Sequence, residues 1–411
     1  MKRSLGSRLS ALRGTGELKT GRQVAEEPAE GTREDLFPGE GKEEKTAYGP
    51  CYFREQKFPL EYRHGESTLA GFLACAGPEL ALPARDKNLC NFKPEKAIFL
   101  DIETTGLSGG TGTWAFLIGL GWTESNEFVL RQYFLRRPAE ERAVLNHFNS
   151  SVSDYQTIIT FNGKQFDLPL IRTRQVMAGF KPIEPELHLD LLQCARVLWK
   201  KRLASRSLRS IEEMLLDIKR TDDIPGAEIP EVYFNYLRRG ETTLLKKVFH
   251  HNALDILSMA TLLERVYRTT TGQLDKHPAE SLALGSLCLE SGRSAEGIEY
   301  LREASSHYPG PLAEEAAFKL SFHFKRQGRW KEAIKIWEEA VANNPPSIPA
   351  LVELAKYYEH KEGHFQTALD LTEKALILAR TDRNTFLETR SEFSIQALMH
   401  RRNRLNRRLG S

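Results

Sequence analysis

A repeat of about 35 residues dominates the last third of the chain. Gly292, Gly328 and Gly363 are 36 and 35 residues apart, and each is followed by a segment with helical character. Small residues recur in register after each glycine: Gly297, Ala333 and Ala368 form one set, and Ala304, Ala340 and Ala375 form the next. A unit of this size cannot bury its own apolar face, so such units fold by stacking on their neighbours.

The period is close to the ~34 residues of tetratricopeptide repeats, and small residues are typical of positions where paired helices cross. We therefore expect an all-α tetratricopeptide-type solenoid over residues 277–380. An arbitrary helical bundle would not require several positions to agree in register. Residues 381–411 carry no acid after Glu392, and we expect a basic C-terminal helix or tail there, with a solvated surface as its default role.

The N-terminal residues have a different composition. Residues 1–48 contain few large apolar side chains, so they cannot offset the entropy of ordering, and we expect a disordered tail. Residues 49–90 gain aromatic side chains and are expected to form an irregular lead-in that packs on the next domain.

Between residues 91 and 270 the pattern predicts an α/β domain. Apolar runs at Ala97–Leu100, Trp114–Leu120 and Phe128–Leu135 predict three strands in series, which favours an antiparallel meander. A strand at Thr157–Phe161 and a helix over about Thr242–Tyr267 follow. Strands that alternate with helices indicate an α/β layer.

Composition limits the class of protein. Lys and Arg total 58 and Asp and Glu total 55, so overall charge alone does not indicate a nucleic-acid-binding protein, and any basic site must be local. The five scattered cysteines suit a reducing, cytoplasmic compartment better than zinc binding or redox chemistry. No apolar run approaches the ~18 residues of a membrane helix, so we expect no membrane association.

Two acids end the first strand of the α/β domain. Asp101 and Glu103 are two residues apart, so their carboxylates point to the same face. Like charges so close repel unless a cation lies between them, and hard divalent ions such as Mg²⁺ or Mn²⁺ prefer these oxygen ligands. Taken alone, the pair is also compatible with an ordinary strand-to-turn signal.

Two more acids follow in isolated positions. Asp167 begins a helix directly after a strand, where the alternative role is an N-cap, and Asp255 lies within an otherwise apolar helix, where the alternative is a buried ion pair. His251 is four residues before Asp255 and shares its helix face, whereas His250 is five residues before it and diverges. Helix geometry favours His251 as the partner, and the choice between the two histidines as general base stays open.

The motifs Asp101-x-Glu103, Asn162 to Asp167 and His251 to Asp255 together resemble those of the DEDD exonuclease superfamily of the ribonuclease H-like fold. Over residues 91–380 the chain looks like the bacterial YprB-like family, which joins such a domain to tetratricopeptide repeats. The resemblance implies a mixed five-stranded sheet with flanking helices. It also implies that Asp101, Glu103, Asp167 and Asp255 bind the metal.

A nuclease mechanism follows from this resemblance and from the charges. Two metals about 3.5 to 4 Å apart stabilise the negative charge that develops in phosphodiester cleavage, and a neutral imidazole suits the role of general base. We expect a metal-dependent 3′-5′ exonuclease acting on DNA or RNA, with two Mg²⁺ or Mn²⁺ ions and a catalytic His251. An unidentified protein partner is expected at the repeats. The alternative is a catalytically weak or inactive scaffold that binds nucleic acid or proteins through the helical repeats.

A local basic cluster lies between Leu191 and Ile211, where the sequence has no acid. Its cations could neutralise phosphates, and an exposed Trp199 could stack on a base. The alternative is a solvated helix face with Trp199 in the core. The members of the cluster are Arg196, Lys200, Lys201, Arg202, Arg206 and Arg209.

Overall fold

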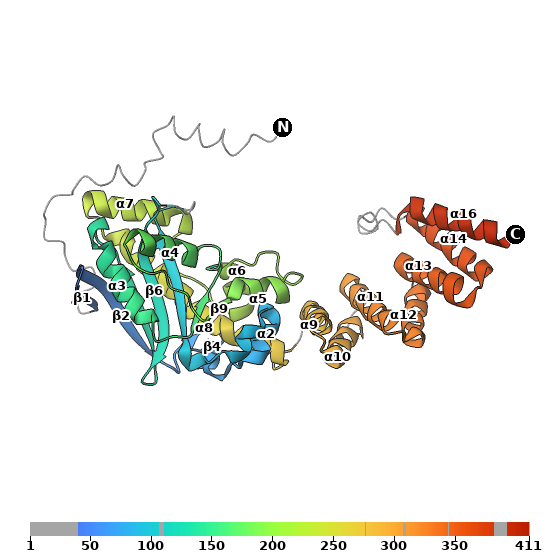
Figure 1. The fold of residues 1–411 in the computed structure, drawn as a ribbon, viewed down its shortest axis with the longest axis horizontal. Coiled ribbons are helices and arrows are strands. Elements are labelled where there is room, and N and C mark those ends of the chain that lie inside the picture. Colours follow the sequence, from blue (N-terminus) through green and yellow to red (C-terminus); the bar gives the residue numbers. More distant parts are fainter. Residues whose placement is uncertain are drawn as a thin grey trace, which may run out of the picture. The chain divides into compact units, whose positions relative to one another are not determined.

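A computed structural model describes residues 40–106, 111–275, 277–306, 310–343, 345–381 and 393–410 (Figure 1). The chain divides into two compact units, residues 1–275 and 276–411. The tail expected over residues 1–48 lies outside the described residues up to residue 39. Among the described residues, no helix is long and apolar enough to span a bilayer.

A mixed sheet of seven strands forms the centre of the first unit, in the order β1-β2-β7-β6-β5-β8-β9. The predicted meander is confirmed, because β5, β6 and β7 pair antiparallel in series. Strands β8 and β9 extend the sheet in parallel from β5. The strands are β1 (Gly41–Thr46), β2 (Gly49–Pro59), β5 (Ala97–Thr104), β6 (Ala115–Glu124), β7 (Glu127–Phe134), β8 (Thr157–Thr160) and β9 (Leu187–Asp190).

The expectation of five strands was wrong, because residues from the supposed tail and lead-in join the sheet. β2 pairs antiparallel with β7, and β1 pairs with β2 as the edge strand. Most side chains of β1 are exposed, and its sequence Gly-Lys-Glu-Glu-Lys-Thr is strongly charged. A charged edge strand resists pairing with other chains. The same charged composition lacks the alternation of apolar and polar residues by which a strand is recognised in a sequence.

Helices cover both faces of the sheet (Figure 1). The main-chain carbonyl of Phe249 in α8 and the side chain of Asn252 accept hydrogen bonds from Gln132 of β7, whereas the neighbouring Tyr133 pairs with His147 of α3. Adjacent strand residues point to opposite faces, so α8 and α3 lie on opposite sides. The helices are α2 (Gly77–Ala84), α3 (Glu141–Val152), α4 (Asp167–Met177), α5 (Leu191–Leu198), α6 (Leu208–Ile211), α7 (Ile229–Arg239) and α8 (Thr243–Thr271).

Two glycines bring α8 close to the sheet. A Cβ added at Gly119 would lie 2.3 Å from Oδ1 of Asn252, and one at Gly121 would lie 2.5 Å from the side chain of Ile256. Real Cβ atoms do not approach other atoms so closely. Glycine at these two positions on one face of β6 therefore sets the distance between α8 and the strands, and with it the position of every polar residue on that side of the helix.

The second unit is all-helical, and each helix packs on the next. Most small residues of the repeat lie buried: Ala304, Ala333, Ala368 and Ala375 are at most 1% exposed, whereas Ala340 is partly buried. The repeat glycines Gly292, Gly328 and Gly363 adopt left-handed φ angles of 85°, 73° and 70° in the turns. The helices are α9 (Pro278–Glu290), α10 (Ser294–Ser306), α11 (Pro311–Arg326), α12 (Trp330–Ala342), α13 (Ile348–Tyr357), α14 (Phe365–Thr381) and α16 (Ile395–Leu409).

The basic end of the chain forms helix α16, which packs against α14. Arg401 and Arg404 both donate to Glu359, whose side chain is fully buried, at distances of 2.6 to 2.9 Å. The side chain of Arg401 is 14% exposed and so departs from the solvated surface expected by default, whereas that of Arg404 is 37% exposed and remains partly solvated. A buried carboxylate needs such partners, so α16 is part of the packed unit.

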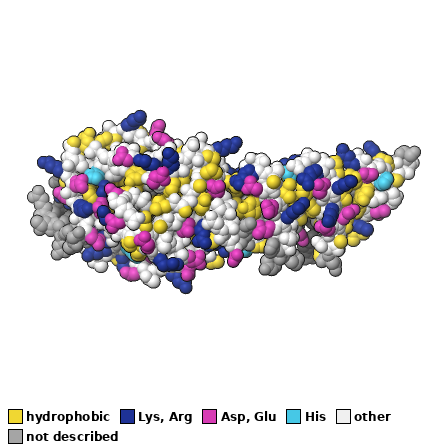
Figure 2. All heavy atoms as spheres, turned by 90° about the horizontal axis from the view of Figure 1, so that it is seen from below, with side chains coloured by type: hydrophobic (Ala, Val, Ile, Leu, Met, Phe, Trp, Pro, Cys, Tyr) yellow, Lys and Arg dark blue, Asp and Glu magenta, His cyan; other side chains and the backbone are white. Residues whose placement is uncertain are grey.

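Charge is spread over the surface. Figure 2 shows Lys and Arg side chains interspersed with Asp and Glu over the visible face, which agrees with the totals of 58 and 55. Because the charges are mixed over the surface, a basic binding region can be identified only from the residues that line one groove or pocket.

Candidate active site

The carboxylates of Asp101 and Glu103 lie on the face of the sheet that α8 covers. In the ladder, Asp101 is opposite Gly119 of β6, and Gly119 is opposite Gln132 of β7. Asn252 of α8 lies over this row: its Oδ1 accepts from Nε2 of Gln132 at 2.9 Å, and its Nδ2 donates to Oδ2 of Asp101 at 2.8 Å. The glycine leaves the space in which this bridge forms.

The structure brings the carboxylates of Asp101 and Glu103 into electrostatic contact with those of α4 and α8. Burial raises the pKa of Asp101 well above its ordinary value, and the negative charges of Asp255, Glu103 and Asp167 raise it further. Burial likewise raises the pKa of Glu103, followed by the charges of Asp255 and Asp167. Like charges influence each other to this extent only at short range, so the four acids occupy one region.

Asp167 is the first residue of α4 and is 8% exposed. Burial, the charge of Asp190 and the charge of Asp255 raise its pKa to about 7, although a backbone hydrogen bond acts in the opposite direction. Asp190 ends β9 and accepts from the backbone N–H groups of Asn162 at 2.9 Å and Lys164 at 3.1 Å. It therefore fixes the loop that leads to Asp167, which is a structural role.

Asp255 is bound to a cation from another segment. Nη2 of Arg220 donates to Oδ1 of Asp255, and the same guanidinium forms two hydrogen bonds of 2.6 Å with Glu212, whose side chain is fully buried. Burial raises the pKa of Asp255 even though the positive charges of Arg220 and His251 oppose the shift. Both alternatives considered for Asp255 are thus realised together: the residue belongs to the acid group and also forms a buried ion pair.

His251 faces the acids and His250 is exposed. Nε2 of His251 lies 3.8 Å from Oδ2 of Asp255, and its Nδ1 lies 2.8 Å from Oδ1 of Asp223. Burial would raise the pKa of Asp223, but the hydrogen bond from His251 and the charges of His251 and Arg220 hold it below its ordinary value. An ionised Asp223 favours the proton on Nδ1, and in the neutral ring Nε2 then carries the lone pair.

The donor set suits a hard divalent cation. Carboxylate oxygens are the ligands that Mg²⁺ and Mn²⁺ prefer, and the mutual repulsion of the buried acids would be relieved by positive charge between them. Among the described residues, no three His, Cys, Asp or Glu side chains are already arranged as a ligand cluster. Asn252 and Arg220 currently donate to Asp101 and Asp255, respectively.

Sequence reasoning missed three residues of this region: Arg220, Asp223 and Asn252. Arg220 and Asp223 come from the loop that precedes α7, in the charged run Lys219-Arg220-Thr221-Asp222-Asp223, which looks like a solvated turn. Asn252 did leave a signal in the sequence, because it is an amide next to His251 in an otherwise apolar helix. Such an amide, which is fully buried in the structure, requires a polar partner.

Two aromatic residues of the first unit have opposite environments. Trp199 is fully buried, which confirms the alternative of a core position, so it does not offer a face for a base to stack on. Phe166, which precedes Asp167, is 51% exposed and does not face the core. Trp199 follows the last residue of α5, and Phe166 precedes the first residue of α4.

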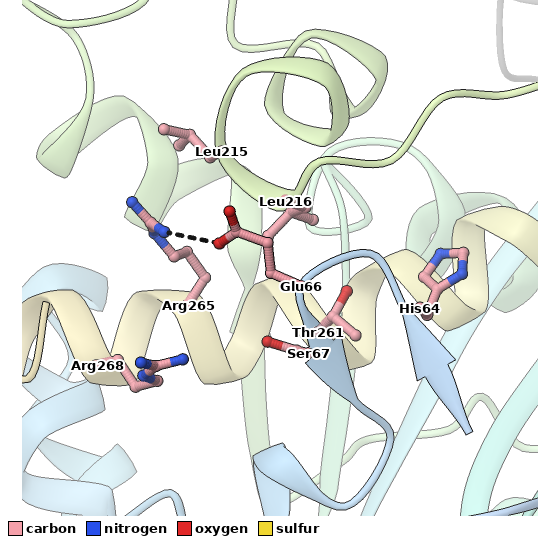
Figure 3. Close-up of a pocket in the computed structure, with 8 residues that line it drawn as sticks. All are labelled: His64, Glu66, Ser67, Leu215, Leu216, Thr261, Arg265 and Arg268. Atoms are coloured by element: carbon pink, nitrogen blue, oxygen red, sulfur yellow. Dashed lines mark ion pairs between the residues drawn. The ribbon is translucent and has the colours of Figure 1, made fainter. Parts of the chain in front are cut away.

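The pocket drawn in Figure 3 is a small packing void. It lies between α8, the hairpin β3 (Arg63–His64) and β4 (Ser67–Thr68), and residues 215–216, and Glu66 and Arg265 approach to 3.8 Å beside it. Its volume of about 10 Å³ is close to the minimum for one water molecule. It is too small to admit a substrate.

Comparisons with known proteins agree with this architecture. Residues 98–267 match the family model described as the RNase_H superfamily. The chain is 34% identical over 341 residues to the uncharacterized protein YprB of Bacillus subtilis (strain 168), which covers 79% of this chain and 80% of that protein. It is also 33% identical over 91 residues to DNA polymerase 1 of Sulfurisphaera ohwakuensis, which covers 22% of this chain and 10% of the polymerase.

Proposed function

Because the chain belongs to the family of the Bacillus subtilis protein YprB and carries an RNase H-like domain, we propose that it is a metal-dependent nuclease that hydrolyses phosphodiester bonds of DNA or RNA. The observation that carries the proposal is the mutual electrostatic coupling of Asp101, Glu103, Asp167 and Asp255. Buried acids destabilise a fold when left unpaired, so their gathering in one region of the first unit argues for a chemical role.

The finer assignment is a 3′-5′ exonuclease of the DEDD type. The partial similarity to a DNA polymerase and the order of the three acid motifs support it. The four acids would hold two Mg²⁺ or Mn²⁺ ions, which supply Lewis-acid stabilisation of the oxygens at the reacting phosphate. This chain's residues do the rest: Asn252 orients Asp101, and Arg220 holds Asp255.

His251 is the proposed general base. With the proton kept on Nδ1 by Asp223, its Nε2 is free to accept a proton from an attacking water. The arrangement of a carboxylate behind an imidazole fixes the tautomer and the orientation of the ring. His250, which is exposed, has no such support.

We further propose that the helical unit is a tetratricopeptide-type solenoid that binds a protein partner or guides the substrate. The buried small residues at the repeat positions support this assignment. The five free cysteines support a cytoplasmic location.

The test is a manganese-supported degradation assay with labelled single- and double-stranded DNA and RNA. Asp101→Asn is the matched control, because its amide retains an oxygen that can accept from Asn252 and the fold is expected to survive. We expect the wild-type chain to shorten at least one substrate from its 3′ end and the variant to shorten none. Equal activity of the two proteins would refute the assignment of the acids.

A scaffold without nuclease activity is the second candidate. The ion pair between Arg220 and Asp255 favours it, because a guanidinium occupies one oxygen of a proposed metal ligand. A scaffold need not bind divalent ions, so the absence of Mn²⁺ binding together with retained nucleic-acid binding would select this candidate.

A further inference from the structure

A wide groove lies between the end of α2, the helix α5 and the loop before α4. Its volume is about 510 Å³, and it is lined by residues from all three segments. The charged lining residues are Arg85, Asp86, Lys164 and Arg196. The groove therefore carries three cations and one anion, on a surface where the charges are otherwise closely balanced.

The basic side chains reach the groove from positions far apart in the sequence. Arg85 is exposed and ends α2 with a φ of 53°, and Arg196 is exposed on the groove face of α5. The single acid has a structural task, because the side chain of Asp86 accepts from the N–H of Asn88 at 3.0 Å and caps the turn that follows. Asp86 is thus held by its own segment.

The groove is joined to the site through one buried acid. Asp190 caps the N-terminus of α5 and also accepts from the backbone of Lys164, three residues before Asp167. Arg196 follows Asp190 by six residues, which is about 9 Å along a helix axis. The loop that carries Asp167 and the helix that carries Arg196 are therefore held in fixed register by Asp190.

We infer that this groove binds the phosphodiester backbone of a single nucleic-acid strand whose end reaches the carboxylates. The inference rests on the proposed function. Arg and Lys side chains neutralise phosphates, and the guanidinium fork of Arg matches phosphate oxygens. A volume of about 510 Å³ is in the range of a drug-sized ligand, which is enough for a short run of one strand. DNA and RNA share this backbone chemistry.

The test measures binding separately from cleavage. Full-length protein in EDTA is titrated against fluorescent single-stranded oligodeoxyribonucleotide and oligoribonucleotide, and anisotropy is followed between 50 and 200 mM salt. The variant is the double substitution Arg85→Ser with Arg196→Ser. The matched control is Lys57→Ser with Arg238→Ser, which removes the same charge from exposed positions outside the groove and the site.

We expect the groove variant to bind the strands more weakly than the wild type and to lose about 1.4 from the slope of log K against log salt, because each lost phosphate contact on a single strand contributes about 0.7. The control should retain the wild-type slope. The same titration with a duplex of the same sequence distinguishes strand binding from duplex binding. A titration with polyglutamate tests an acidic polypeptide as the occupant.

Equal slopes for the groove variant and the control would overturn the inference, as would a loss confined to the duplex or to polyglutamate. Failure of the wild type to bind any strand would overturn it as well. If binding of the strand depends on the groove but the protein degrades no substrate with Mn²⁺, the inference about the groove is supported and the nuclease proposal is refuted. The two failures are therefore distinguishable.

Discussion

The ion pair between Arg220 and Glu212 gives the most quantitative prediction. Both side chains are withdrawn from water, at 3% and 0% exposure, and two hydrogen bonds of 2.6 Å join them. In Arg220→Met the carboxylate of Glu212 stays buried without its partner. Breaking a buried pair from one side costs about 3 to 5 kcal/mol. For a unit of this size, that corresponds to a fall of roughly 6 to 20 °C in melting temperature.

The second variant separates charge from packing. Adding Glu212→Leu to Arg220→Met removes the stranded carboxylate, and replacement of both partners by apolar groups is often nearly neutral. We expect the double variant to recover a large part of the lost stability. Recovery should be incomplete, because Asp255 and Asp223 still lack the guanidinium that both contact in the wild type.

The assay is differential scanning calorimetry of the full-length chain in EDTA, which removes any contribution from bound metal. The transition of the first unit, residues 1–275, should be the one that shifts, and the transition of the helical unit should not. A melting temperature of Arg220→Met within about 2 °C of the wild type, or a double variant no more stable than the single, would show that the pair does not act as a buried charge pair.

Three further predictions concern other parts of the chain. His64 is buried, and burial lowers its pKa to about 4. As the pH falls below about 6.5, this histidine therefore binds a proton in the unfolded state before it does so in the folded state. Protonation of this group should lower the free energy of unfolding of the first unit by about 2 kcal/mol between pH 7 and pH 5. In His64→Gln, the midpoint of urea denaturation should therefore change less with pH over that range. Gly119→Ala should weaken the unit by about 1 to 3 kcal/mol in the same denaturation assay, because its Cβ would displace Asn252; unchanged stability would contradict the close approach of α8. Deletion of residues 381–411 should lower the melting temperature of the helical unit, because Glu359 loses both arginine partners. An unchanged melting curve would mean that α16 does not stabilise the helical unit.

The strands and acids were predictable because each left a local pattern. Apolar runs of strand length separated by turns predicted the meander β5-β6-β7, and the two-residue spacing of Asp101 and Glu103 fixed a common face. The period of the small residues predicted a helical unit for the same reason, because burial at helix crossings repeats along the chain.

The remaining features depend on partners that are distant in the sequence. Strand β1 is charged and gains its structure only by pairing with β2. Arg220 looks like part of a solvated turn, but in the structure it contacts Glu212 and Asp255 from other segments as well as the nearby Asp223. Trp199 lies among cations in the sequence, yet it is fully buried directly after the end of α5. None of these outcomes follows from spacing along one segment.

The proposed metal site is tested most directly by calorimetric titration of the metal-free full-length protein with Mn²⁺, followed by the same titration of Asp101→Asn. The account predicts saturable binding by the wild type that is lost or strongly weakened in the variant, while the melting curves of the two apo proteins both show a folded chain. Identical isotherms for the two proteins, or no binding by the wild type, would contradict it.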